Sequence, residues 1–225
     1  WGRCASSPHP RPAPSPAQGH VWPNRPASWR GAWASYPGTR QRPQHHESIL
    51  MKSSRHYGEL CYPFIHETST LCDFEMVTDE LCTLIGMALS AMPPEMADLA
   101  ADLDHLQPLA FHVNGSIRGT LAVEEADVQW VVQRLRHYQD ALGPRQHTFI
   151  LPRGTVPVPQ LHLARSCAKK AIRALVRVEQ EGHAIPDVLP RICNAMCNLF
   201  FLMTLVVNRR RGLDEVPFAS KSYKV

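Results

Sequence analysis

Residues 149–175 read FILPRGTVPVPQLHLARSCAKKAIRAL, and this stretch contains no Asp or Glu. Apolar residues recur at the helical period through its second half, so we predict a helix from about residue 159 to residue 180 that ends before Gly182. Residues three or four apart are neighbours on a helix surface. The cations that share one side of this helix are Arg165, Lys169, Lys170 and Arg173. The stretch therefore predicts a helix with an unbalanced positive face.

Four more helices follow from the same apolar period. Their predicted spans are about 70–92, 95–107, 124–142 and 186–208. The signals that end the first three are Pro93-Pro94, Pro108 with Asn114-Gly115, and Gly143-Pro144. Five helices with short connections predict an all-α, five-helix up-and-down bundle. We place this bundle at residues 70–208, an extended arm and linker at 1–69, and a basic tail at 209–225.

The N-terminal residues differ from the bundle in charge and composition. Residues 1–46 contain six Arg and no Lys, Asp or Glu, whereas the remainder carries 18 basic and 20 acidic side chains. Nine prolines within residues 1–47 exclude helix and favour polyproline II and turns. Arginine contacts phosphate and tryptophan stacks or fills a pocket. We predict that this arm is either solvated or lies on RNA or a partner protein.

The candidate RNA or partner contacts lie in the arm and directly after the last predicted helix. They are Trp22, Arg25, Trp29, Arg30, Trp33, Arg40, Arg42, Arg209, Arg210 and Arg211. The last three also suit the negative C-terminal end of a helix, which is a purely structural explanation of their position.

Several classes of site find no support in the sequence. The seven cysteines are scattered, and Cys193 and Cys197 share a helix face without the further ligands that zinc requires, so we predict no metal site. The most apolar run, at residues 198–207, is too short to span a membrane. No Walker loop, G-x-S-x-G or H-E-x-x-H motif is present.

Three phrases, in this order along the chain, carry a resemblance to a known family. They are TDELCTLIG at residues 78–86, FILPRG at 149–154 followed by LHLARSCAKKAIR at 161–173, and PDVL at 186–189. Through them the chain resembles the ATP:cob(I)alamin adenosyltransferases of the propanediol-utilisation type between about residues 70 and 208. The resemblance implies a five-helix bundle that forms a homotrimer with ATP at its subunit interfaces. It also implies transfer of the 5′-deoxyadenosyl group of ATP to the cobalt of reduced cobalamin.

The sequence departs from the family pattern where the family binds phosphate. Residues 53–74 replace a glycine-rich phosphate loop and contain one glycine, Gly58. Ile172 stands in place of the family's Glu, and Lys169 in place of the first Arg of a pair. Residues 193–200, CNAMCNLF, replace the phrase NRLSDYLF. Since Lys lacks the bidentate geometry of Arg, we expect phosphate chemistry to be weakened or lost.

These departures favour a pseudoenzyme without a cofactor. Its expected role is that of a structural subunit in a large mitochondrial ribonucleoprotein assembly, the mitochondrial ribosome or an assembly intermediate, with rRNA and neighbouring proteins as partners. The mitochondrial location follows only from the family's habit and the arm's composition. Two alternatives stay open: a divergent adenosyltransferase that uses ATP, Mg and cobalamin, and a nucleotide or cobalamin sensor.

The same four cations are the candidates for residual nucleotide binding: Arg165, Lys169, Lys170 and Arg173. For Arg165 we favour a structural salt bridge to Asp79 or Glu80, because both carboxylates of the family phrase are also present.

Overall fold

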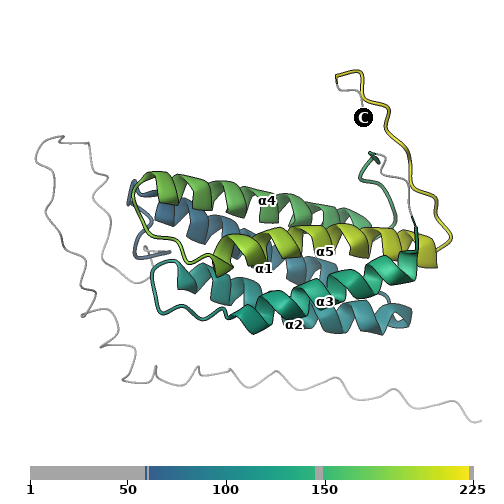
Figure 1. The fold of residues 1–225 in the computed structure, drawn as a ribbon, viewed down its shortest axis with the longest axis horizontal. Coiled ribbons are helices and arrows are strands. Elements are labelled where there is room, and N and C mark those ends of the chain that lie inside the picture. The colour runs from purple at the N-terminus through teal and green to yellow at the C-terminus, as the bar shows by residue number, and fades with distance from the viewer. Residues whose placement is uncertain (1–58, 60, 145–148, 223–225) are drawn as a thin grey trace, which may run out of the picture. The chain divides into compact units, whose positions relative to one another are not determined.

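The computed structural model describes residues 59, 61–144 and 149–222, and within these ranges it forms a bundle of five α-helices (Figure 1). The helices are α1 (Thr70–Ser90), α2 (Ala97–Ser116), α3 (Glu125–Leu142), α4 (Val158–Gln180) and α5 (Val188–Arg210), with a short 3-10 turn, η2 (Pro94–Met96), before α2. Helix α4 packs between α1 and α5, while α2 packs on α1 and α3 packs on α5. The predicted all-α five-helix bundle is confirmed. The predicted N-terminal arm lies outside the described residues up to residue 58.

Helix starts follow local capping chemistry. The Ser69 hydroxyl accepts a hydrogen bond from the Leu71 N–H and caps α1. Glu124 and Asp127 form a capping box at the start of α3. At α1 a second cap comes from far along the chain, because the Thr70 N–H also donates to the Glu181 carboxylate at the end of α4. The start of α1 and the end of α4 are therefore joined.

Helix α2 corrects one prediction. It runs through Pro108 to Ser116, so the prediction that Pro108 ends this helix is wrong. Proline removes one backbone hydrogen bond from a helix interior. Leu106, Leu109 and Val113 on the same helix are fully or almost fully buried. Burial of these side chains on both sides of the proline outweighs the lost bond, so the helix continues.

Helix α5 forms the centre of the core. It has the length and apolar composition of a membrane-crossing helix, but 72% of its apolar 18-residue stretch is buried inside the bundle. Leu199, Phe200 and Met203 are fully enclosed by other helices. Buried core helices can have the same length and composition, and the burial of α5 accounts for its apolar sequence.

Gly86, inside α1, leaves room for a side chain of α2. A Cβ at this position would lie 2.5 Å from Nε2 of Gln107 on α2. The Gln107 side chain crosses this gap to donate a hydrogen bond to the Cys82 carbonyl at 3.3 Å. The glycine of the TDELCTLIG phrase thus makes room for the Gln107 hydrogen bond between α2 and α1.

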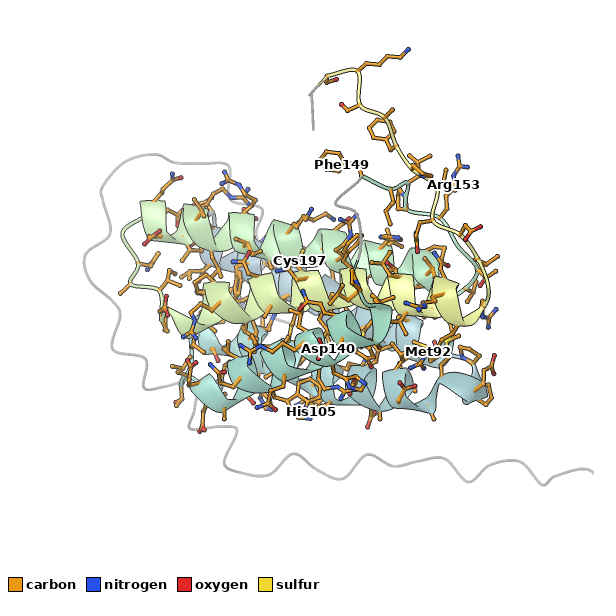
Figure 2. The ribbon with its side chains drawn as sticks, turned by 45° about the vertical axis from the view of Figure 1, so that its right-hand side comes forward. Met92, His105, Asp140, Phe149, Arg153 and Cys197 are labelled. Atoms are coloured by element: carbon orange, nitrogen blue, oxygen red, sulfur yellow. The ribbon has the colours of Figure 1, made fainter. Side chains whose placement is uncertain are left out.

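The segment before α4 pairs with the segment after α5 (Figure 2). Ile150 and Pro217 form an isolated antiparallel bridge, and the Leu151 N–H donates to the Val216 carbonyl at 2.8 Å. Asn208, near the end of α5, donates to the Arg153 carbonyl at 3.1 Å. This pairing fixes the approach to α4, and hence the start of the basic helix.

Two enclosed ionic networks join the helices on the α2 side. Arg134 of α3 donates from Nε to the buried Asp102 of α2 at 2.7 Å, and the Tyr138 hydroxyl donates to the same carboxylate. Arg118 donates to the buried Glu75 of α1 at 2.8 Å. Burial and the hydrogen bond with Asp102 raise the pKa of Tyr138 above its ordinary value, so this phenol stays protonated.

Candidate anion-binding site on α4

The cations of α4 form one continuous row. Arg165, Lys169, Arg173 and Arg177 are four residues apart, so successive members rise by about 6 Å along the helix. Each step of four residues also turns about 40° around the axis. The row therefore winds from the α5 side of α4 at Arg165 to the α1 side at Arg177. Arg177 had not been singled out from the sequence, although the four-residue spacing predicts it.

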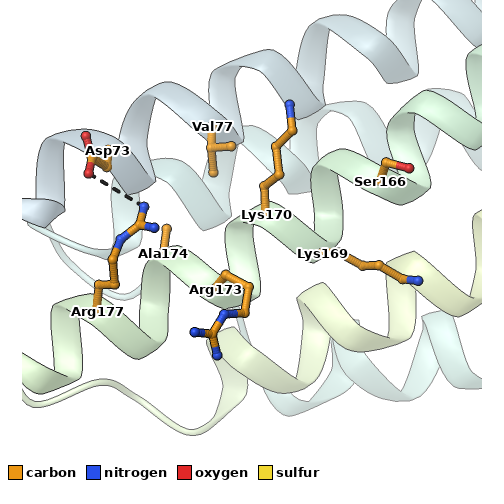
Figure 3. A pocket seen from close by; sticks show the side chains of 8 residues that line it. All are labelled: Asp73, Val77, Ser166, Lys169, Lys170, Arg173, Ala174 and Arg177. Carbon is orange, nitrogen blue, oxygen red and sulfur yellow. Dashed lines mark ion pairs between the residues drawn. The ribbon is translucent and has the colours of Figure 1, made fainter.

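A groove of about 420 Å³ follows the α1 side of this row. Its lining residues are Asp73, Val77, Ser166, Lys169, Lys170, Arg173, Ala174 and Arg177. Figure 3 shows Lys170 and Arg177 reaching toward α1, whereas Lys169 and Arg173 extend away from it. Lys170 pairs with Glu80 at 3.2 Å, and Arg177 pairs with Asp73 at 3.6 Å. Lys169 and Arg173 have no ion pair within the described ranges.

Arg165 does not form the salt bridge that the sequence favoured. Neither Asp79 nor Glu80 lies within ion-pair distance of it, and Glu80 pairs with Lys170 instead. Lys170 follows Arg165 by five residues, which places the two side chains about 140° apart around the helix. Because Lys170 faces α1, Arg165 faces α5, where its guanidinium lies 5.8 Å from the centre of the Phe201 ring. That prediction is wrong for this geometric reason.

Arg165 is left with an unsatisfied donor. Its Nε is buried and has no hydrogen-bond partner. A buried donor without a partner costs about 1–3 kcal/mol, so such a group favours any ligand that supplies an acceptor. Among the cations of α4, Arg165 alone is in this state within the part of the chain that the structure describes. It is therefore the strongest anchor for an anion on the α5 side.

Two residues near Arg165 on the α5 side of α4, Ile172 and Cys197, carry no negative charge. Ile172 follows Arg165 by seven residues, so it lies on the same helix face, and its side chain is partly buried against the core. This position therefore supplies no carboxylate that would compete with an anion. Burial raises the pKa of the neighbouring Cys197 thiol, while the positive charges of Lys169 and Arg165 oppose this rise. The thiol thus stays protonated next to the cations.

His162 is a buried base one turn before Arg165. Both of its ring nitrogens lack a hydrogen-bond partner. Burial, with a smaller contribution from the Arg165 charge, lowers its pKa to about 4. The imidazole is therefore neutral at pH 7, and it adds no charge to the site.

The cations after α5 are held by the bundle. Arg210 pairs with Asp98 through both guanidinium ends, at 2.6 and 2.7 Å. Arg209 donates to the Leu142 carbonyl at 2.7 Å, and Arg211 donates to the Thr155 hydroxyl at 3.2 Å. Each of the three arginines therefore has a hydrogen-bond partner within the bundle. Their contact with RNA stays a prediction.

The remaining candidates cannot be placed in the site. Those in the arm lie outside the described residues: Trp22, Arg25, Trp29, Arg30, Trp33, Arg40 and Arg42. Cys193 and Cys197 are both buried in α5. No group of three or more possible metal ligands occurs among the described side chains.

Two curated bacterial proteins are similar to this chain. The Cobalamin adenosyltransferase of Cupriavidus metallidurans is 34% identical over 140 residues, covering 61% of this chain and 74% of the relative. The Corrinoid adenosyltransferase of Bacillus subtilis is 31% identical over 147 residues, covering 62% of this chain and 75% of the relative.

Solved structures show the same fold. A variant of the PduO-type ATP:corrinoid adenosyltransferase from Lactobacillus reuteri, complexed with ATP, matches with a TM-score of 0.63 and 21% identity over 68% of this chain and 90% of the other. A second variant, complexed with cobalamin and ATP, matches with a TM-score of 0.62 and 20% identity over 69% of this chain and 89% of the other. The sequence profile described as Cobalamin adenosyltransferase matches residues 67–207, and the chain therefore belongs to the cobalamin adenosyltransferase family.

Proposed function

We propose that this chain binds ATP on the α5 side of α4 and acts as a corrinoid adenosyltransferase. The observation that carries the proposal is the buried, unpartnered Nε of Arg165 at the head of the cation row. Arg165 would bind a phosphate oxygen, and Lys169, which has no ion pair among the described residues, would add charge one turn later. The curated relatives bear the names of adenosyltransferases, which supports the same activity here.

The chain's own residues suit the departure of a triphosphate. When an adenosyl group leaves ATP for reduced cobalt, the triphosphate retains the negative charge, and fixed cations stabilise it. Arg165 and Lys169 lie on a rigid helix that is packed between two others, so they need little rearrangement to do this. Neutral His162 and protonated Cys197 add no negative charge that would repel the phosphates. Mg²⁺ would be bound by the nucleotide, with the chain supplying the cations around it. By the resemblance, the active form would be a homotrimer.

A non-catalytic role is the second candidate. It is favoured by Ile172, which packs against the core where the family has a Glu, and by the Arg-rich segment before the bundle. In this proposal the chain is a structural subunit of a mitochondrial ribonucleoprotein assembly. Sedimentation of the endogenous protein from a mitochondrial lysate, with and without ribonuclease, tests it. Migration as a free trimer under both conditions contradicts this second proposal.

Calorimetric titration of the full chain with Mg-ATP tests the first proposal, followed by a spectroscopic assay of adenosylcobalamin formation from reduced cobalamin. We expect binding and product, and Arg165→Ala should weaken ATP binding by at least about tenfold. Arg136→Ala, an exposed Arg on α3, is the matched control and should bind normally. Binding without product would identify a nucleotide sensor. Absence of ATP binding would overturn the proposal in favour of the structural subunit.

A further inference from the structure

The α1–α4 groove carries three cations that the proposed ATP site does not use, Lys170, Arg173 and Arg177. Four of its eight lining residues are cations, and only Asp73 among them is acidic. Around the axis of α4, Lys170 and Arg177 lie about 140° and 120° from Arg165, and Arg173 lies about 80° from it. From Lys169 to Arg177 the cations extend over eight residues, or about 12 Å along the axis. A ligand that meets all of them must carry several anionic groups in a line.

The ion pairs across this groove leave its cations available. In the Lys170–Glu80 pair the two side chains are 59% and 49% exposed, and in the Arg177–Asp73 pair they are 51% and 60% exposed. Exposed pairs contribute little because water and salt screen them. A phosphate can therefore replace either carboxylate at small cost, since it offers a stronger acceptor for the same donor.

The lining also indicates how the ligand would be recognised. The uncharged lining residues are Val77, Ser166 and Ala174, and none of the described residues that line the groove is aromatic. Single-stranded nucleic acids are held by cations along the backbone and, where bases are recognised, by aromatic stacking. A groove with cations and no aromatic platform contacts phosphates without selecting bases.

We propose that the α1–α4 groove binds the phosphate backbone of single-stranded RNA without reading its sequence. A linear array of phosphates matches the row of cations better than one compact triphosphate does, because the cations are spaced along about two helical turns. Ser166 adds a hydroxyl donor at one end of the row. This inference does not depend on the proposed adenosyltransferase activity, which rests on Arg165 on the other side of α4.

Fluorescence anisotropy of the full chain with a labelled oligouridylate, over a salt series, tests the proposal. Each phosphate neutralised on a single strand contributes about −0.7 to the slope of log affinity against log salt. Arg177→Ala should make the slope less steep by about 0.7 and weaken binding several-fold in low salt. Any contact made by the Arg-rich N-terminal segment is common to every variant, so it cancels in this comparison.

Arg136→Ala, on α3, removes an equal charge far from the groove and should leave the slope unchanged. Mg-ATP affinity should be the same in Arg177→Ala as in the unchanged chain, which separates this inference from the proposed function. The proposal is overturned if the oligouridylate does not bind, if the Arg177→Ala and Arg136→Ala slopes are equal, or if inorganic tripolyphosphate binds the groove and RNA does not displace it.

Discussion

The ion pairs on the two sides of the bundle differ in exposure. Between α2 and α3, Asp102 is 9% exposed as a side chain and accepts from Arg134 and Tyr138 at once. Between α1 and α4, the carboxylates of Asp73 and Glu80 are 60% and 49% exposed, and each meets one cation. In the first arrangement three side chains hold one another, since Arg134 also donates to the Tyr138 hydroxyl. The second leaves donors for a ligand, so the difference separates charge that holds the fold from charge that can bind.

The largest expected effect is the loss of Asp102. Asp102→Ala leaves Arg134 and the buried Tyr138 hydroxyl without their acceptor, and removing one partner of such a pair costs about 3 kcal/mol. Urea unfolding measures the change, with the exposed Asp104→Ala on the same helix as control. A decrease in the free energy of unfolding below about 0.5 kcal/mol would mean that the Asp102 network contributes no more than the exposed pairs of the groove.

Protonation of His162 gives the next largest effect. Burial holds its folded pKa near 4, below the ordinary 6.5, so between these values the unfolded chain binds a proton that the folded chain does not. Stability is therefore full above pH 6.5 and falls as the pH drops toward 4, by at most about 1.4 kcal/mol per pH unit. His162→Gln should flatten this dependence in urea unfolding at several pH values, and the exposed His112→Gln should not. Parallel curves for His162→Gln and the unchanged chain would contradict the assignment.

An intermediate case is the pair of Arg210 and Asp98. The bidentate hydrogen bond from Arg210 lowers the pKa of Asp98, so its contribution is present above the ordinary carboxyl pKa and is lost as the pH falls. Both side chains are partly exposed, at 36% and 41%, so Arg210→Ala should cost only about 0.5–1 kcal/mol at pH 7. Thermal unfolding at pH 7 and at pH 3 checks this. An effect that is the same at both pH values would point to packing instead of charge.

The groove pairs should show the smallest effect. Arg177→Ala should change the free energy of unfolding by less than about 0.5 kcal/mol, because the 3.6 Å pair with Asp73 is exposed. Chemical unfolding of this variant beside Asp102→Ala gives the direct comparison. A cost above about 1 kcal/mol would mean that the groove cations serve the fold, and the contrast would fail.

The sequence predicted the helices because their apolar periods and stop residues are local. It failed at Pro108, where burial of Leu106 and Leu109 outweighs a local stop signal. It predicted the cations of α4, but it could not orient them, since the rotation of α4 between α1 and α5 depends on packing. Because of that rotation, Glu80 forms its ion pair with Lys170, and the Nε of Arg165 has no hydrogen-bond partner. The Asp102 network was not predicted, because Asp102 is separated from Arg134 and Tyr138 by 32 and 36 residues and the three follow no motif.

The hydrogen bonds from Thr70 and Ser69 to Glu181 have a consequence for the order of folding. They join residues separated by 111 and 112 positions in the chain. Closing so long a loop costs more entropy than forming any neighbouring helix pair, and contacts of this kind are slow to form. We therefore expect the α1–α4 groove to form late in folding, which pulse-labelling hydrogen exchange of α1 and α4 would measure. A polyanion that recognises this groove would bind the completed bundle and stabilise it against unfolding, by an amount that grows with the logarithm of the polyanion concentration.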